Sequence, residues 1–126
     1  MSTAENTETV VGFYTQSFND GEPEAAASRA LGTSYVQHNP SAPDGAEAFI
    51  AYVHSMRTRF PGLHVDVKRT VAEGDLVVTH SAFHLAPGDR GMAVADLWRL
   101  EDGRIVEHWD VMQQVPEQAA NANTMF

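Results

Sequence analysis

The spacing of apolar residues changes once along this sequence, near Leu63, and the change restricts the folds that the chain can adopt. Before Leu63, apolar residues recur every three or four positions, which predicts amphipathic helices over residues 3–19, 22–31 and 44–60. After it, stretches rich in β-branched and aromatic residues predict four strands over residues 63–72, 76–85, 92–100 and 104–115. Helices followed by hairpin-linked strands predict an α+β domain, with the helices covering one face of an antiparallel sheet.

Local signals mark where several of these elements begin and end. Asp44 and Glu47 have the spacing of a capping box, so we expect them to start the third helix, which ends at Pro61. Residues 35–40, with the sequence Tyr-Val-Gln-His-Asn-Pro, form a short extended piece, because Pro40 disfavours helix at the residue before it. The tail from residue 116 onward has no clear period.

Length and charge exclude several classes of function. A chain of 126 residues that is 43% hydrophobic can form one domain with a sizeable core, and we place that domain over residues 1–126. The net charge of −9 argues against nucleic-acid and anionic-membrane partners, both of which attract basic surfaces. Cysteine is absent, and neither a secretory signal nor a membrane-spanning apolar run is visible. We therefore expect a cytoplasmic protein.

The segment from Asp96 to Asp110 combines strand-forming residues with several ionisable side chains. Its two predicted strands flank a tight turn at residues 102–103, yet they also carry Asp96, His108 and Asp110. A strand that only packs on a core has no structural need for three such groups. If they project into a pocket, they form an acid/base set in a partly apolar wall.

The turn determines whether these side chains meet. With a two-residue turn, Asp96 lies opposite Trp109, and the other two ionisable groups point to the opposite face. With a three-residue bulged loop, Asp96 lies opposite His108, while Asp110 lies on the same face and opposite Val94. We favour the three-residue loop without a second bulge, because it gathers a mixed surface suited to a ligand: Val94, Asp96, Trp98, His108, Asp110 and Met112.

The other face of this hairpin is also apolar, through Leu97, Trp109 and Val111. The helices can cover only one face of the sheet, so the second face needs another cover. A second copy of the chain is the simplest cover. We therefore expect a homodimer that forms through the outer face of the sheet.

Four segments resemble a known family: residues 35–40, the Val-Val-Thr-His strand at 77–80, the hairpin at 96–110 and the ending at 123–126. Together with three helices before a long sheet, they resemble the SnoaL-like polyketide cyclases of the nuclear transport factor two-like superfamily. The resemblance implies a single SnoaL-like domain. Its fold would be a cone-shaped, curved antiparallel sheet packed on three N-terminal helices, with an internal cavity for a small-molecule ligand.

The resemblance also implies a chemistry. SnoaL-like cyclases close a ring by intramolecular aldol condensation, without a metal or a cofactor, and use an aspartate as acid and base. The position that matches this aspartate is Asp110. Family members often carry a histidine where this chain has Asp96, so the chain departs from the pattern by placing a second carboxylate there.

The residues around Asp110 also favour it as a general base. Removing a proton next to a carbonyl needs a carboxylate whose pKa is raised by apolar neighbours such as Trp98 and Met112. Asp96 can raise the pKa of His108 and orient its ring, or it can share a proton with Asp110. The predicted catalytic residues are therefore Asp110, Asp96 and His108. The competing interpretation is a structural Asp–His pair.

Other side chains are candidates for substrate contacts. His38 and Asn39 lie on the extended piece and can cross the mouth of a cavity, although Asn39 can equally shape the turn into Pro40. His80 can bind a substrate oxygen if its face of the strand lines the cavity, and Tyr14 can donate from the first helix. The predicted substrate-binding residues are His38, Asn39, His80, Trp98, Tyr14 and Met112.

These residues favour a cofactor-independent enzyme for aldol condensation, cyclisation or isomerisation of a small, largely apolar carbonyl compound. We expect no metal, because the histidines lack the close helical spacing typical of metal sites, and no phosphate-binding loop occurs. Two alternatives stay open. One is a non-catalytic ligand-binding or dimerisation domain, and the other is a small hydrolase or hydratase in which Asp110 activates water.

Overall fold

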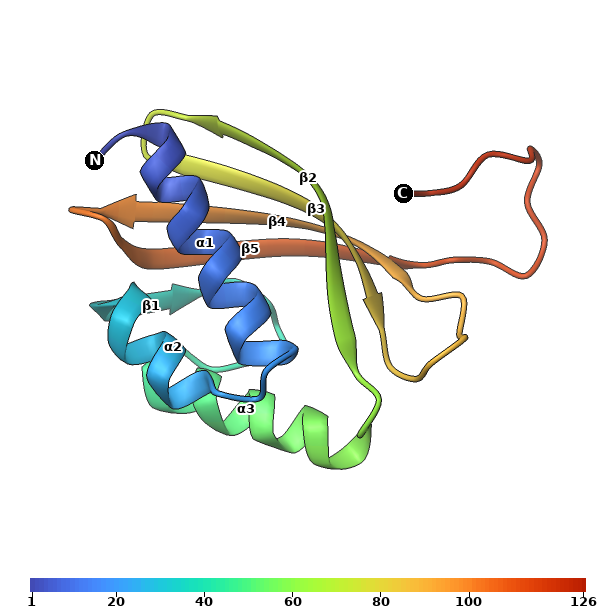
Figure 1. Ribbon diagram of the computed structural model, residues 1–126, viewed down its shortest axis with the longest axis horizontal. Helices are drawn as coiled ribbons and strands as arrows, with labels where there is room; N and C mark the ends of the chain where they lie inside the picture. The colour runs from blue at the N-terminus through green and yellow to red at the C-terminus, as the bar shows by residue number, and fades with distance from the viewer.

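The computed structural model describes the whole chain, residues 1–126, as three helices packed on a five-stranded sheet (Figure 1). The helices are α1 (Thr3–Phe18), α2 (Pro23–Ala30) and α3 (Ala46–Arg59), and the strands are β1 (Leu31–Gln37), β2 (His64–Glu73), β3 (Leu76–His84), β4 (Met92–Glu101) and β5 (Arg104–Gln114). Every helix and strand predicted from the apolar spacing is present, which confirms the α+β class. None of the helices has the length and apolar character needed to cross a membrane.

The strands lie in the order β1-β5-β4-β3-β2. The last four in sequence form the predicted antiparallel meander. β1, however, runs parallel to β5, so the sheet is mixed rather than wholly antiparallel. The sequence predicts that residues 35–40 are extended but carries no local signal for their partner. The parallel pairing places Gln37 directly beside His108.

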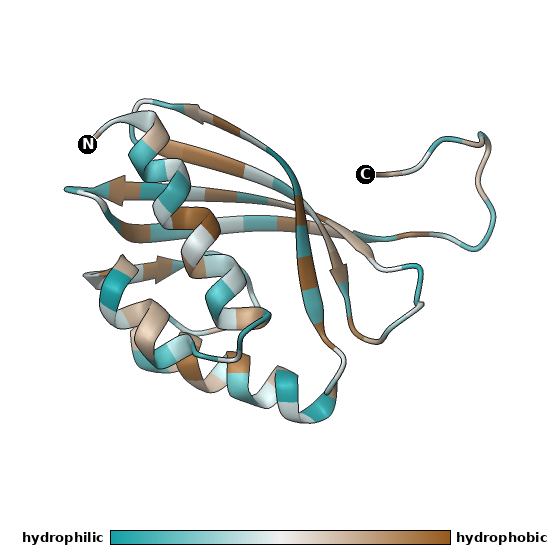
Figure 2. Ribbon diagram, viewed as in Figure 1, coloured by the Kyte–Doolittle hydropathy of each residue, from teal (hydrophilic) through white to brown (hydrophobic).

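The core lies between α1 and the sheet that α1 crosses (Figure 1). A capping box starts α1: Ser2 Oγ accepts from the Glu5 N–H, and the Glu5 carboxylate accepts from the Ser2 N–H. Val10 and Phe13 are fully buried, and the Phe13 ring meets the Trp98 ring edge-on at 5.9 Å. Hydrophobic and hydrophilic residues alternate along the strands (Figure 2), as expected when one face of a sheet packs on helices.

The start of α3 differs from the prediction. The N-cap is Gly45, with φ of 98°, and no side chain caps the helix, so the predicted capping box is wrong. The Asp44 carboxylate instead accepts a hydrogen bond of 2.7 Å from the backbone N–H of Gln37. Asp44 therefore ties the segment before α3 to the end of β1, a tertiary contact that competes with the local cap.

The β4–β5 hairpin has a two-residue turn, so the predicted three-residue loop is wrong. Asp102 and Gly103 both have positive φ, 50° and 76°, as a tight hairpin turn of this kind requires. A bulge then follows, because Arg99 lies opposite Glu107 whereas Leu100 lies opposite Ile105. The bulge shifts β5 by one residue, so Asp96, His108 and Asp110 point to the same face of the hairpin, as predicted. Asp96 consequently lies opposite Asp110, not opposite His108, and His108 lies opposite Trp98.

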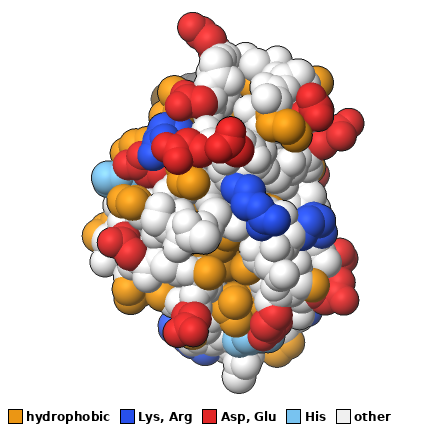
Figure 3. Space-filling model, turned by 90° about the vertical axis from the view of Figure 1, so that its left-hand side faces the viewer, with side chains coloured by type: hydrophobic (Ala, Val, Ile, Leu, Met, Phe, Trp, Pro, Cys, Tyr) orange, Lys and Arg blue, Asp and Glu red, His pale blue; other side chains and the backbone are white.

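The surface reflects the acidic composition of the chain. Carboxylate side chains are spread over much of the face in Figure 3, and the Lys and Arg side chains there are few. The net charge is −9. This face therefore offers no continuous basic stripe of the kind that follows a nucleic-acid backbone.

Candidate active site

A cavity of about 130 Å³ lies between α1, α3 and the concave face of the sheet. Thirteen of its 18 lining residues are hydrophobic. The other five come from β1, the segment that follows it, β4 and β5; they are Gln37, Asn39, Asp96, His108 and Asp110. The ionisable and amide side chains thus come from neighbouring strands and the segment after β1, in a mainly apolar wall that suits a largely apolar ligand with a few polar atoms.

Asp96 and His108 form a buried pair within this polar group. His108 Nε2 lies 2.8 Å from Asp96 Oδ1, and the two side chains are only 7% and 3% exposed. Burial raises the pKa of Asp96, and the hydrogen bond from His108 opposes this rise without cancelling it. The imidazole and the carboxylate are therefore in direct hydrogen-bond contact in a buried setting that disfavours an isolated carboxylate charge.

Gln37 determines which nitrogen carries the proton in the neutral ring of His108. Its Oε1 accepts from the backbone N–H of Asn39 at 3.0 Å, so the amide oxygen faces the site. The same oxygen lies 2.7 Å from His108 Nδ1. Because an amide oxygen only accepts, Nδ1 must be the protonated nitrogen, and Nε2 is left to face Asp96.

Thr79 and Trp98 support the second oxygen of Asp96. The Thr79 hydroxyl donates to Asp96 Oδ2 at 3.3 Å and accepts from the Trp98 indole N–H at 3.1 Å. Thr79 and Trp98 are both buried. The indole therefore directs the Thr79 proton toward the carboxylate, which holds Asp96 in one orientation.

Asp110 is the more accessible carboxylate of the site. Its Oδ2 accepts a hydrogen bond of 2.9 Å from Asn39 Nδ2. Asn39 Oδ1 accepts from the Ser41 backbone N–H at 2.8 Å, which fixes the amide so that its NH₂ group faces Asp110. No side chain or backbone group of the protein donates to Asp110 Oδ1, so this oxygen is available to a ligand in the cavity.

Tyrosine hydroxyls add neutral donors to the cavity wall. Burial raises the pKa of Tyr14 well above its usual value, and the nearby Asp96 carboxylate raises it further. Burial likewise raises the pKa of Tyr35 and of Tyr52. All three side chains line the cavity, so each can donate a proton in a hydrogen bond without itself becoming an anion.

Most of the predicted site residues line this cavity together. They are Tyr14, Asn39, Asp96, Trp98, His108, Asp110 and Met112. The prediction that one face of the hairpin gathers the three ionisable groups is therefore right about the face, although it is wrong about the opposing pairs.

Two predicted substrate contacts lie elsewhere. His38 stacks on Trp109, with ring centroids 4.8 Å apart, and its Nε2 lies 2.7 Å from Glu107 Oε2, outside the cavity. His80 pairs with Arg69 and does not line the cavity, because Thr79 and Ser81 are the buried residues of this part of β3. The sequence Val-Val-Thr-His-Ser-Ala-Phe-His is mixed on both faces, so alternation alone could not identify the inner one.

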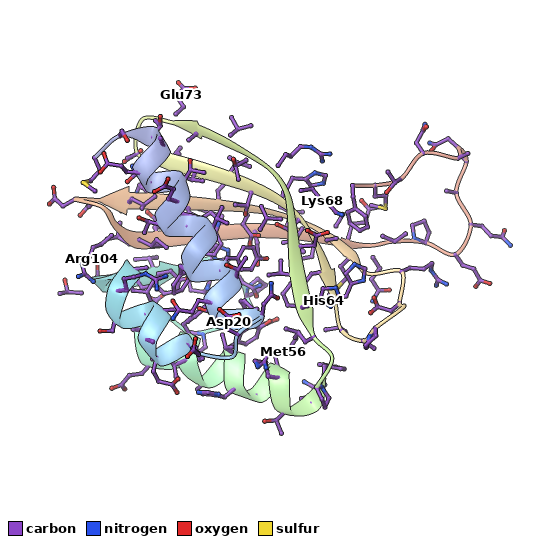
Figure 4. All side chains as sticks on the ribbon, in the orientation of Figure 1. Asp20, Met56, His64, Lys68, Glu73 and Arg104 are labelled. Atoms are coloured by element: carbon purple, nitrogen blue, oxygen red, sulfur yellow. The ribbon has the colours of Figure 1, made fainter.

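Sequence reasoning missed Gln37, Thr79 and Tyr52 as parts of the site. Tyr52 had a usable signal, because it lies three residues after Phe49 and four before Met56 on α3, and all three line the cavity. Figure 4 labels Met56 on this helix. Gln37 had no comparable signal, since its role depends on the parallel pairing of β1 with β5.

Asp96, His108 and Asp110 are also the one group of side chains with ligand atoms close enough to hold a metal ion, all within 4.8 Å of one another. Both ring nitrogens of His108 are already hydrogen-bonded, Nδ1 to Gln37 and Nε2 to Asp96. A metal ion would have to displace the contact between His108 and Asp96. The donor set therefore fits the hydrogen-bonded Asp96–His108 pair better than it fits a metal.

The sequence as a whole matches a known family. Residues 8–120 match the model of the SnoaL-like polyketide cyclases. The chain belongs to this family. No curated protein sequence matches it.

Solved structures of other SnoaL-like and NTF2-like proteins have the same fold. TsrD from Streptomyces laurentii is 23% identical, covers 89% of this chain and 90% of its own, and has a TM-score of 0.74. IdmH from Streptomyces antibioticus, provisionally assigned as a polyketide cyclase, is 25% identical over 85% and 91% of the two chains, with a TM-score of 0.69. An NTF2-like protein of unknown function from Mesorhizobium loti is 26% identical over 88% and 93%, with a TM-score of 0.70.

Proposed function

We propose that this SnoaL-like protein is a cofactor-independent enzyme that catalyses aldol condensation, cyclisation or isomerisation of a small, largely apolar carbonyl compound. The observation that carries the proposal is the position of Asp110. One of its oxygens is held by Asn39 at 2.9 Å, and the other is free toward a cavity lined mainly by hydrophobic residues. A carboxylate in such a place can reach a weakly acidic C–H bond without competition from bulk water.

In this mechanism Asp110 first removes a proton from the carbon next to the substrate carbonyl, and the electron pair of that C–H bond forms an enolate. The enolate carbon then attacks a second carbonyl carbon, so that a C–C bond forms and the attacked C=O becomes an alkoxide. Asp110, now protonated, returns its proton to the alkoxide. An isomerisation uses the same first step and returns the proton to a different carbon.

The contact between Asp96 and His108 would reduce the repulsion between the Asp96 and Asp110 carboxylates. Asp96 lies directly opposite Asp110 on the neighbouring strand, where two carboxylates would repel each other. A proton held by the Asp96–His108 pair would remove this repulsion and leave the Asp110 carboxylate as the base. The Tyr14 hydroxyl, whose pKa is raised by burial and by Asp96, would supply a neutral donor for the developing enolate oxygen.

Exchange of carbon-bound hydrogen tests this proposal without knowledge of the natural substrate. The protein is incubated in heavy water with benzylacetone, an apolar ketone, and proton NMR follows deuterium entering the positions next to the carbonyl. Asp110→Asn should slow this exchange by about 10²–10⁴-fold, the usual contribution of a general base. Asp66→Asn, which alters an exposed aspartate paired with Lys68, is the matched control and should exchange at the original rate.

Other outcomes favour the alternatives. Equal exchange by Asp110→Asn and the unaltered protein would reject Asp110 as the base. If benzylacetone perturbs the Trp98 fluorescence but exchanges no deuterium, the ligand-binding interpretation is favoured. Incorporation of labelled oxygen from water into a ligand would favour a hydrolase or hydratase.

A further inference from the structure

A second hollow adjoins the cavity at the end of the sheet where the chain turns from β3 into β4. It measures about 310 Å³ and shares three lining residues with the cavity: Phe83, Leu85 and Met92. The loop between β3 and β4 lies beside the end of β5 (Figure 1), because Met92 pairs with Gln114. Leu85 and Met92 are only partly buried, and an unbranched methionine side chain adapts readily to its neighbours. A ligand longer than the cavity can therefore extend past these two residues into the hollow.

Arg90 is the only lysine or arginine among the residues that line the cavity or the hollow. Its Nε donates to the carbonyl oxygen of Val115 at 3.3 Å, which holds the side chain against the end of β5. Its two terminal amino groups have no hydrogen-bond or ion-pair partner in the protein. These groups form a planar fork that matches the two oxygens of a carboxylate.

The loop that carries Arg90 is held in place, and its own carboxylate is already engaged. Asp89 Oδ1 lies 2.6 Å from His84 Nδ1, and Asp89 Oδ2 accepts from two backbone N–H groups of the same loop at 3.0 and 3.3 Å. The backbone N–H of Val115 donates to the carbonyl oxygen of Gly91 at 3.1 Å, which ties the loop to the end of β5. Arg90 therefore extends from a fixed backbone, and its terminal amino groups are open to a ligand.

The hollow lies well away from the reacting groups. Asp110 and Gln114 are four residues apart on β5, so the edge of the hollow at Gln114 lies about 13 Å from Asp110 by the strand rise. This distance matters because a ligand carboxylate beside Asp96 and Asp110 would be repelled, in a chain whose net charge is already −9. A ligand with a carboxylate therefore needs that group at its far end, and a cation there to hold it.

We propose that the substrate is an apolar carbonyl compound with a carboxylate at its far end, and that Arg90 binds this carboxylate in the second hollow. The inference rests on the proposed function, which places the reacting carbonyl beside Asp110. The apolar part of the substrate lies in the cavity and passes Leu85 and Met92, with about 13 Å between the carbonyl and the carboxylate. Arg90 is then a specificity-determining residue, because it selects the charged end without touching the reacting atoms.

Calorimetric titration with methyl-ketone fatty acids and their methyl esters tests the proposal. The twelve-carbon acid, with its ketone next to the terminal methyl group, is long enough to span the distance, whereas the six-carbon acid is too short. The ratio of acid affinity to ester affinity for the twelve-carbon pair should fall about fivefold in Arg90→Gln, the upper end for an exposed ion pair. The ratio for the six-carbon pair should not depend on Arg90.

Two further variants and salt show whether the effect comes from the charge at this place. Arg59→Gln is the matched control, because Arg59 is an exposed arginine that lies against the Phe60 ring and lines neither the cavity nor the hollow. It should leave the ratio unchanged, and Arg90→Lys, which keeps the charge, should retain most of it. Added salt should lower the ratio in the unaltered protein. Circular dichroism of each variant shows whether the fold is kept.

The proposal is overturned if the twelve-carbon acid does not bind the unaltered protein, if folded Arg90→Gln keeps the original ratio, or if Arg59→Gln lowers the ratio as much. Deuterium exchange separates this inference from the proposed function. Exchange that depends on Asp110, together with a ratio that does not depend on Arg90, would reject the carboxylate subsite alone. A ratio that depends on Arg90, without any exchange, would reject the catalytic step and leave the carboxylate subsite in place.

Discussion

Replacing Gln37 with leucine should destabilise the protein and remove the hydrogen bond that keeps the proton of neutral His108 on Nδ1. The leucine side chain is shorter by one atom and has no acceptor, so two donors lose their partner: His108 Nδ1–H and the Asn39 backbone N–H. Each buried donor left unsatisfied costs about 1–3 kcal/mol. Gln37 is itself only partly buried, so water can reach part of the gap, and we expect a loss of about 2–4 kcal/mol.

Urea unfolding measures this loss directly, and a decrease of that size is large beside the roughly 5–15 kcal/mol that stabilises most domains. In the same samples, the ¹⁵N chemical shifts of the His108 ring report which nitrogen is protonated. Gln37→Glu is the matched control, since its carboxylate keeps an acceptor at the same place and should preserve protonation of Nδ1. The reasoning is refuted if Gln37→Leu unfolds at the original urea concentration and keeps the original tautomer.

Three further predictions concern stability, the inner face of β3 and assembly. The raised pKa of Asp96 means that its contribution to stability is fully present below the unfolded value of about 3.8 and is lost as pH rises through the folded pKa. Asp96→Asn should therefore gain stability relative to the original protein as pH rises above 4, which urea unfolding across pH can follow. Thr79→Val, which removes the acceptor of a buried indole N–H, should cost about 1–3 kcal/mol, whereas His80→Ala on the outer face should change neither the unfolding free energy nor deuterium exchange. The expected homodimer should be visible by light scattering at micromolar concentration and should be weakened by Val111→Lys, because Val111 is 71% exposed on the outer face; a monomer at all concentrations would contradict it.

The local pattern of the sequence was sufficient for the three helices, the four strands of the meander and their order, but it missed residues 31–34 of β1. Helical and strand periods differ, so the change near Leu63 separates the helices from the meander, and Asp102 with Gly103 marks the last turn. These signals are local, because they depend on backbone preferences and on which residues of one element face a common side. The polar residues of the cavity wall were partly readable too, since Asp96, His108 and Asp110 lie on one hairpin and all three line the cavity.

The tertiary structure decided how these side chains meet. The bulge after Ile105 sets which residue faces Asp96, and it accommodates burial of both Ile105 and Val106, a requirement that comes from the rest of the fold. The parallel pairing of β1 brings in Gln37 and Asn39, which set the tautomer of His108 and hold Asp110. Register and strand partners depend on contacts between residues far apart in sequence, and a shift of one residue reverses every side chain while leaving each strand's composition unchanged.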